Sequence, residues 1–164
     1  MNDGLAPGGK IPFREPADHE VAAGAIGGLT ASIAVWVPAT LASPAEHGPL
    51  FPLRLVAASV LGAGALDSGA AAPAVVGAAL AALVAVVFGL VFVSILPPAA
   101  TSRKALLAGG AYGAALFAPT WFALVRVVDP ILYSAGYALP AFLLHVGYGA
   151  LLGIQVPLLR KVFP

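Results

Sequence analysis

Four long apolar stretches without a charged side chain constrain this 164-residue chain more than any other feature. They lie at about residues 21–43, 73–96, 105–125 and 140–159. A helix needs about 20 mostly apolar residues to cross the hydrocarbon core of a bilayer. Only 9% of the residues are charged, whereas a typical soluble domain has about 25%. The sequence therefore predicts an all-α polytopic membrane protein with four transmembrane helices.

The segments outside these stretches are short or polar. Residues 1–20 hold six of the 15 charged side chains and lack the apolar run of a secretory signal. We expect this segment to be a flexible polar tail, with Asp18 as the cap of the first helix. A further apolar segment, at 55–66, is too short to cross a bilayer. We expect it to form a short interfacial or re-entrant helix within the four-helix transmembrane domain at 21–164.

The basic residues favour one orientation of the four spans. Four crossings put the tail, the loop at 97–104 and the C-terminus on the same side of the membrane. That side carries Lys10, Arg14, Arg103, Lys104, Arg160 and Lys161, and the other side carries Arg54 and Arg126. Cytoplasmic segments of membrane proteins have an excess of Lys and Arg. We therefore expect both termini to be cytoplasmic.

Three of the four stretches contain two glycines spaced four residues apart. The pairs are Gly24 and Gly28, Gly109 and Gly113, and Gly149 and Gly153. Small residues at this spacing lie on one helix face and let two backbones approach closely. Their presence in three helices favours packing within one bundle over the alternative, a seam between copies of the chain.

Four aromatic side chains fall toward the outer ends of the spans or in the outer loops. They are Trp36, Trp121, Tyr133 and Tyr137. Trp and Tyr are enriched at membrane–water interfaces. We expect these side chains to anchor the protein at the interface rather than to stack on a ligand.

One histidine lies inside a predicted span. His145 is about five residues into the fourth stretch and shares a helix face with Gly149. It either relays protons or binds a metal or haem, or it is a neutral imidazole bonded to another helix. The other histidines, His19 and His47, lie in the tail and in a loop, and Cys is absent. We therefore expect no cofactor and no metal site, and His145 is the single cofactor-binding candidate.

Charged residues gather beside the spans on the predicted outer side. They are Arg54, Asp67, Arg126, Asp129, Glu46 and His47. Arg126 and Asp129 are three residues apart and can pair on one helix face. We expect this group to anchor the protein at the interface, and the alternative is a substrate vestibule. In the third span, Thr120 follows Pro119, so its hydroxyl can bond a carbonyl that the proline frees.

Four blocks of the chain carry a family resemblance. They are FPLRLVAASVLGAGAL (51–66), VVFGLVFVSIL (86–96), AGGAYGAALFAPTWF (108–122) and LLHVGYGALLG (143–153). In order and spacing they resemble small bacterial four-span integral membrane proteins of uncharacterised function. Some members are labelled sodium/proline symporters, a label that the length of this chain does not fit. Related sequences carry a His near Ala81 and an Asn near Thr120. The resemblance implies four spans in the bacterial cytoplasmic (inner) membrane.

The chain lacks the sequence motifs of the common enzyme classes. It contains no Walker A motif, no HExxH and no credible Ser-His-Asp arrangement, and no acidic residue stands in the middle of a span. Its net charge of +1 provides no attraction to nucleic acid. We expect a non-enzymatic accessory or structural component of a membrane complex. Its partners are then the lipid bilayer and other membrane subunits or further copies of itself. The alternatives are a small oligomeric transporter or channel and a haem-binding membrane subunit.

Overall fold

A computed structural model describes residues 17–43, 47–67 and 71–163 of the chain, and all regular structure in these segments is helical. Within these segments, four helices are long and apolar enough to cross a membrane. They are α1 (Asp18–Leu41), α4 (Ala72–Ile95), the continuous helix Ser102–Val128 and α8 (Ala138–Val162). The predicted all-α chain with four helices of spanning length is confirmed.

The third of these long helices is not uniform. It consists of α5 (Ser102–Pro119), a π-helical segment η1 (Thr120–Val125) and one last turn, α6 (Arg126–Val128). Pro119 has no N–H to donate to the preceding turn, which loosens the helical ladder there. A π-helical turn is one of the few ways in which a helix continues through such a defect.

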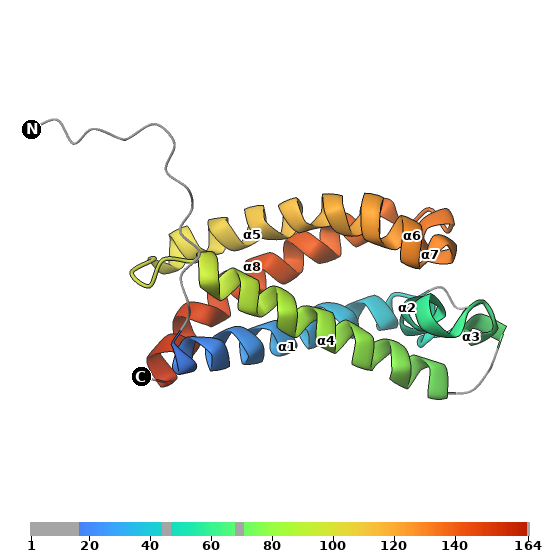
Figure 1. Cartoon of the computed structure of the whole chain (residues 1–164), viewed down its shortest axis with the longest axis horizontal. Coiled ribbons are helices and arrows are strands. Elements are labelled where there is room, and N and C mark those ends of the chain that lie inside the picture. The colour runs from blue at the N-terminus through green and yellow to red at the C-terminus, as the bar shows by residue number, and fades with distance from the viewer. Residues whose placement is uncertain (1–16, 44–46, 68–70, 164) are drawn as a thin grey trace, which may run out of the picture.

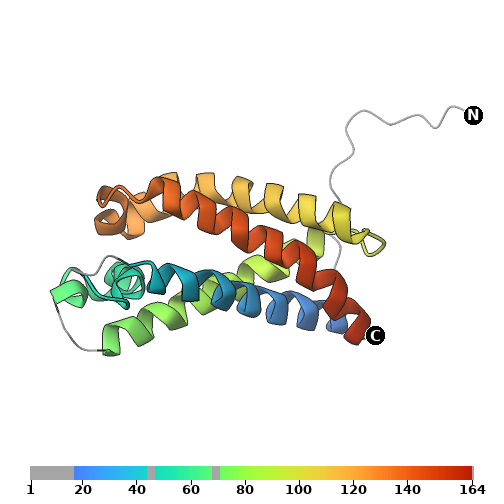
Figure 2. The same ribbon diagram turned by 180° about the vertical axis from the view of Figure 1, so that it is seen from behind.

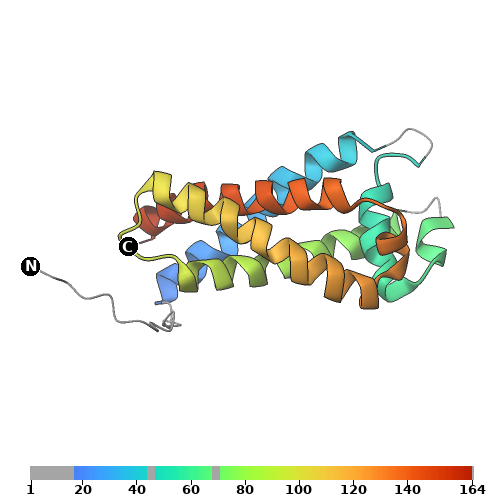
Figure 3. The same ribbon diagram turned by 90° about the horizontal axis from the view of Figure 1, so that it is seen from above.

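The short apolar segment forms two helices instead of one. Helix α2 (Phe51–Leu61) ends at Gly62, and α3 (Gly64–Asp67) follows. Gly62 has φ +72°, a conformation that glycine adopts without steric cost. Figures 1 and 3 show α2 running across the long axis of the bundle. A further short helix, α7 (Pro130–Ser134), precedes α8.

The long helices form two crossed pairs, one layered on the other (Figures 1 and 2). Helix α1 packs on α4, and α5 packs on α8, while the contact of α1 with α8 joins the two pairs. The start of α1, the end of α4, the start of α5 and the end of α8 lie at one end, which we call the basic end after Arg103, Lys104, Arg160 and Lys161. The short helices lie at the far end (Figure 3).

Glycine lets the backbones touch where α1 crosses α4. A Cβ on Gly24 would lie 2.9 Å from both the Gly89 carbonyl oxygen and Val93 Cγ1. A Cβ on Gly28 would collide with the carbonyl oxygen of Ala85. The predicted pair on α1 therefore faces a partner glycine on α4, Gly89, in the same chain.

The crossing of α5 with α8 is built in the same way from both predicted pairs. Gly109 and Gly113 on α5 face Gly149 and Gly153 on α8, and a Cβ on any of the four would collide with a carbonyl oxygen of the opposite helix. All six glycines predicted to pack helices thus lie at contacts within one chain.

Two tyrosines bond the two helix pairs together. Tyr148 Oη on α8 donates to the Ala85 carbonyl at 2.5 Å, and Tyr112 Oη on α5 donates to the Phe88 carbonyl at 2.8 Å. Both acceptors are on α4, one turn apart. The largest fully buried side chains also lie on α4 and α8: Phe92, Val93, Leu152 and Val156. The core is therefore small and lies between the two layers.

The glycine crossings predict a strong dependence on position. Gly149→Ala places a methyl group against the α5 backbone, so we expect it to lower the free energy of unfolding by about 1–3 kcal/mol. Gly147→Ala is the matched control on the same helix, because its Cβ would meet no atom within 4 Å. Unfolding in mixed micelles, followed by tryptophan fluorescence, measures both. Equal stability of the two variants would contradict close backbone contact between α5 and α8 at Gly149.

Candidate functional site

Carbonyl groups at the C-terminal end of α4 lack backbone donors, and Arg160 donates hydrogen bonds to them. Pro97 has no N–H, so the carbonyl of Val93 has no donor four residues ahead. Arg160 Nη2 donates to the carbonyls of Val93 and Leu96, both at 3.1 Å, and Nη1 donates to the carbonyl of Pro97 at 3.2 Å. The side chain of Arg160 is only 10% exposed. One side chain of α8 therefore holds the C-terminal end of α4.

The same guanidinium forms an ion pair with α1. Glu20 Oε1 lies 3.2 Å from Arg160 Nη2, and Glu20 is 3% exposed. Its Oε2 accepts from the backbone N–H of Ala17 at 3.2 Å, which caps the helix. The expected Asp18 cap is wrong, because Ala17 stands at the cap position and Asp18 is already helical. An acidic residue three positions after the cap is the sequence signal that identifies such a carboxylate.

A polar hollow of about 310 Å³ lies beside this ion pair at the basic end. Its walls are the loop before α5 and the last turns of α8, and they include Thr101, Ser102, Arg160 and Lys161. Thr101 caps α5, with Oγ1 accepting from the Lys104 N–H at 3.5 Å. The hollow is thus the meeting point of a helix start and two basic side chains.

At the far end, the predicted pair of Arg126 and Asp129 does not form. Asp129 precedes Pro130, which disfavours the helical conformation at this position, and its φ and ψ are −135° and 70°. The carboxylate instead caps α7, with Oδ1 accepting from the Leu132 N–H at 3.0 Å. The guanidinium of Arg126 lies over the Tyr133 ring, 5.9 Å from its centroid.

The Asp129 carboxyl is nevertheless buried. The residue is 5% exposed, and Oδ2 has no hydrogen-bond partner in the described segments. Burial raises the pKa of this carboxyl, and the hydrogen bond from the Leu132 N–H opposes the shift to a smaller extent. The neutral form is therefore more populated in the folded protein than in an exposed aspartate.

The other members of the predicted outer group contribute little to a site. Arg54 lies on α2, half-buried, and its Nε has no hydrogen-bond partner in the described part of the chain. His47 stacks on Phe51 with ring centroids 4.3 Å apart. Glu46 and the side chain of Asp67 lie outside the described residues. Among the described side chains, the group forms no ion-pair cluster.

His145 faces an apolar surrounding. Its Nδ1 lies 2.7 Å from the carbonyl oxygen of Ala141 on the same helix. The imidazole contacts the Phe117 ring edge-on, at 5.7 Å between centroids. His19 is in the first turn of α1 and His47 precedes α2, and the described residues contain no group of three metal-binding side chains. The imidazole therefore bonds to its own helix, and the predicted bond to another helix does not form among the described residues.

Phe117 also stands at the centre of an aromatic cluster. Trp121, Phe122 and Phe142 surround it at 5.3–6.0 Å between ring centroids. Trp121 is only 4% exposed, so this side chain does not anchor the protein at an interface as predicted. The Thr120 hydroxyl forms no hydrogen bond with described residues, and the π-helical segment that begins at Thr120 directly follows Pro119.

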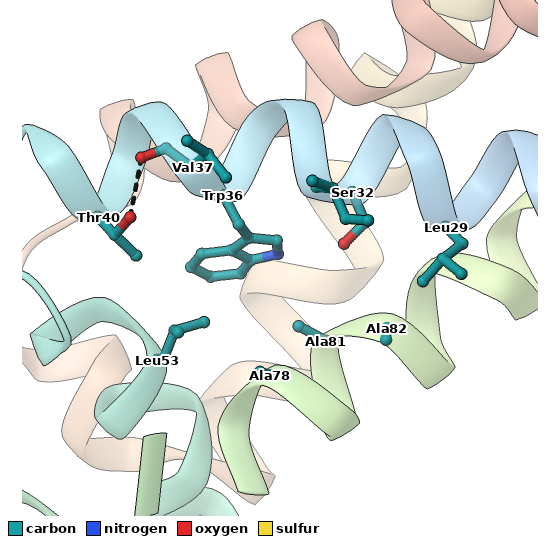
Figure 4. A pocket seen from close by; sticks show the side chains of 10 residues that line it. Leu29, Ser32, Trp36, Val37, Thr40, Leu53, Ala78, Ala81 and Ala82 are labelled. Atoms are coloured by element: carbon teal, nitrogen blue, oxygen red, sulfur yellow. Dashed lines mark hydrogen bonds between the residues drawn. The ribbon is translucent and has the colours of Figure 1, made fainter. Parts of the chain in front are cut away.

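An apolar groove of about 190 Å³ lies between α1, α2 and α4. In Figure 4, the Trp36 side chain projects from α1 toward Ala78 and Ala81 of α4, and Leu53 of α2 closes one side. The Thr40 hydroxyl donates to the Val37 carbonyl at 2.8 Å and is thereby used within α1. The groove therefore offers methyl groups and an indole ring, with little polar chemistry.

Comparisons with protein-family models, curated proteins and solved structures find no match to this chain. The resemblance to bacterial four-span membrane proteins therefore stays a prediction.

The Glu20–Arg160 ion pair predicts a graded loss of stability. Arg160→Met removes the ion-pair partner of a buried carboxylate and the side-chain donor to three carbonyls, so we expect it to cost about 3–5 kcal/mol. Glu20→Gln keeps the carbonyl contacts of Arg160 and removes one charged hydrogen-bond partner, which is worth about 1.5–3 kcal/mol. Lys161→Gln is the control at the next position. Unfolding in mixed micelles measures the stability of all three variants. An Arg160→Met variant as stable as Lys161→Gln would contradict the stabilising role of Arg160.

Proposed function

We propose that this chain is an integral protein of the bacterial cytoplasmic membrane, with both termini in the cytoplasm. Its role is that of a non-enzymatic accessory or structural component of a membrane complex. The short helices α2 and α3 then lie at the outer interface, where α2 runs across the bundle (Figure 3).

The outer surface of the bundle supports a membrane location. Large apolar side chains of the long helices are widely exposed, such as Val75 (66%), Leu83 (61%) and Leu107 (66%). Apolar exposure of this extent is disfavoured in water and is ordinary against lipid tails. The mean hydropathy of +0.98 agrees with this assignment.

The orientation is supported by the distribution of charge between the two ends. In the described segments, the basic end carries Arg103, Lys104, Arg160 and Lys161, and the far end carries Arg54 and Arg126. Lys10 and Arg14 lie outside the described residues. The excess of basic side chains favours a cytoplasmic position for the end where α1 begins and α8 ends.

The main support for a structural role is the way in which polar side chains of the long helices are bonded. Tyr112 and Tyr148 bond to the backbone of α4, and His145 bonds to the backbone of its own helix. At the bundle surface, the exposed Thr30 on α1 donates to Gln155 Oε1 on α8 at 2.7 Å. A transport path needs polar groups that face water or a substrate, whereas these groups already bond to backbone or side-chain atoms of the chain. The arrangement therefore favours a scaffold over a transporter or channel.

The apolar groove supports association with another membrane protein. Its α4 wall consists of Ala78, Ala81 and Ala82, and small residues let a neighbouring helix approach closely. The glycine pairs do not serve this purpose, because their contacts lie within the chain. A subunit of a complex that packs against other spans needs such a surface outside its own bundle.

The absence of cysteine allows a direct test of orientation. Ser134 and Ser102 are both exposed, at the far end and at the basic end respectively. We expect a membrane-impermeant maleimide to label Ser134→Cys in intact spheroplasts and Ser102→Cys only after permeabilisation. Cysteine-free parent protein is the background control. The reverse labelling pattern would contradict the orientation.

The role in a complex predicts stable co-purification. We expect chain extracted in mild detergent at native expression to migrate in a species larger than the protomer, together with other membrane proteins. Ala81→Phe fills the groove and should release the partner, whereas Leu107→Phe alters an exposed position outside it. Migration only at protomer size, without a partner, would count against the proposed role.

A further inference from the structure

We propose that the polar hollow at the basic end binds a phosphate group, supplied by the headgroup of an anionic phospholipid or by free phosphate. The inference goes beyond the accessory role. Its lipid form rests on the proposed membrane location.

The hollow has the size and walls that such a group needs. Its volume of about 310 Å³ is roughly that of ten water molecules in the liquid. Thr101 and Ser102 contribute hydroxyl-bearing residues on one side, and Lys161 contributes an ammonium on the other, next to the ion-paired Arg160. No acidic residue belongs to its described lining. The hollow therefore accommodates one phosphate with its nearest waters.

The two basic residues have different roles in this site. Arg160 is nine-tenths buried and held by three carbonyls and Glu20, so its guanidinium is a fixed part of the wall whose charge Glu20 balances. Lys161 is exposed and forms no ion pair with a described residue. A flexible ammonium beside a fixed guanidinium suits a ligand whose negative charge enters from the membrane surface.

The start of α5 adds to the attraction. The first N–H groups of a helix have no partner within the helix, and the helix dipole places partial positive charge there. Ser102 opens a helix of spanning length and borders the hollow. The start of α5 thus adds partial positive charge to a wall that holds the Lys161 ammonium and the Arg160 guanidinium, whose charge Glu20 balances.

The surroundings favour a lipid as the source. Leu107 on α5 is 66% exposed and Leu158 on α8 is 54% exposed, and each lies on a helix that borders the hollow. Acyl chains can follow these apolar surfaces while the phosphate stays at the helix ends. Basic pockets between membrane helices on the cytoplasmic side are suited to anionic headgroups.

The test measures the thermal unfolding of full-length protein in an uncharged detergent. The additions are dioctanoyl phosphatidylglycerol, dioctanoyl phosphatidylcholine or sodium phosphate at constant ionic strength. We expect the phosphatidylglycerol to raise Tm in a saturable manner and the phosphatidylcholine to have little effect. Lys161→Gln should raise the half-saturating lipid concentration about fivefold, since each basic side chain near an anionic lipid contributes on the order of 1 kcal/mol.

Lys104→Gln is the matched control, because it removes the same charge at the same end but does not line the hollow. Retained lipid stabilisation in this variant supports the site, whereas an equal loss in both variants shows general surface attraction and overturns it. A phosphate-induced rise in Tm that Lys161→Gln abolishes supports free phosphate as the source. Equal effects of the two lipids, or no effect on the parent chain, overturn the proposal. Failure of the maleimide test would overturn the orientation alone, because the melting experiment requires no native membrane.

Discussion

Backbone contact at two helix crossings is the constraint on which the rest of this structure depends. In lipid, apolar side chains gain little by leaving the solvent, so helices associate through close packing and hydrogen bonds. Gly89 meets Gly24 and Gly28 at one crossing, and Gly109 meets Gly149 at the other. Such proximity leaves no room for larger residues and makes the carbonyls of one helix neighbours of the next. It defines two helix pairs, α1 with α4 and α5 with α8.

Hydrogen bonds and one ion pair then hold the two pairs in register. Tyr148 and Tyr112 bond to α4 in the middle of the bundle, and Arg160 bonds to the end of the same helix. The proline after α4 makes this last contact necessary, because it removes a donor that the helix would otherwise have. Glu20 balances the charge of Arg160 and also accepts a hydrogen bond from the Ala17 N–H at the start of α1. One cluster thus fixes three helix ends.

The use of these polar side chains in helix packing also bears on function. Tyr112, Tyr148 and Arg160 bond to other helices of the chain, and the two features proposed to meet other molecules lie at the surface. The apolar groove beside Trp36 suits another membrane helix, and the hollow beside Lys161 suits a phosphate. The proposed helix-binding groove and the proposed phosphate site would together suit a small membrane protein to join other subunits to the bilayer.

The sequence by itself determined the class of fold, the number of long helices and the glycine faces, because hydropathy and the spacing of small residues are local properties. It also located the short apolar segment, although the break at Gly62 divides that segment into two helices. Only the tertiary structure decided which polar groups meet. Glu20 is 140 positions from Arg160, and their contact depends on how α1 and α8 pack. Conversely, Arg126 and Asp129 are neighbours in sequence, yet the proline after Asp129 turns the chain out of the helix that would have paired them. Side-chain chemistry can be read along the chain, but the partner of a charged group depends on the path of the backbone through space.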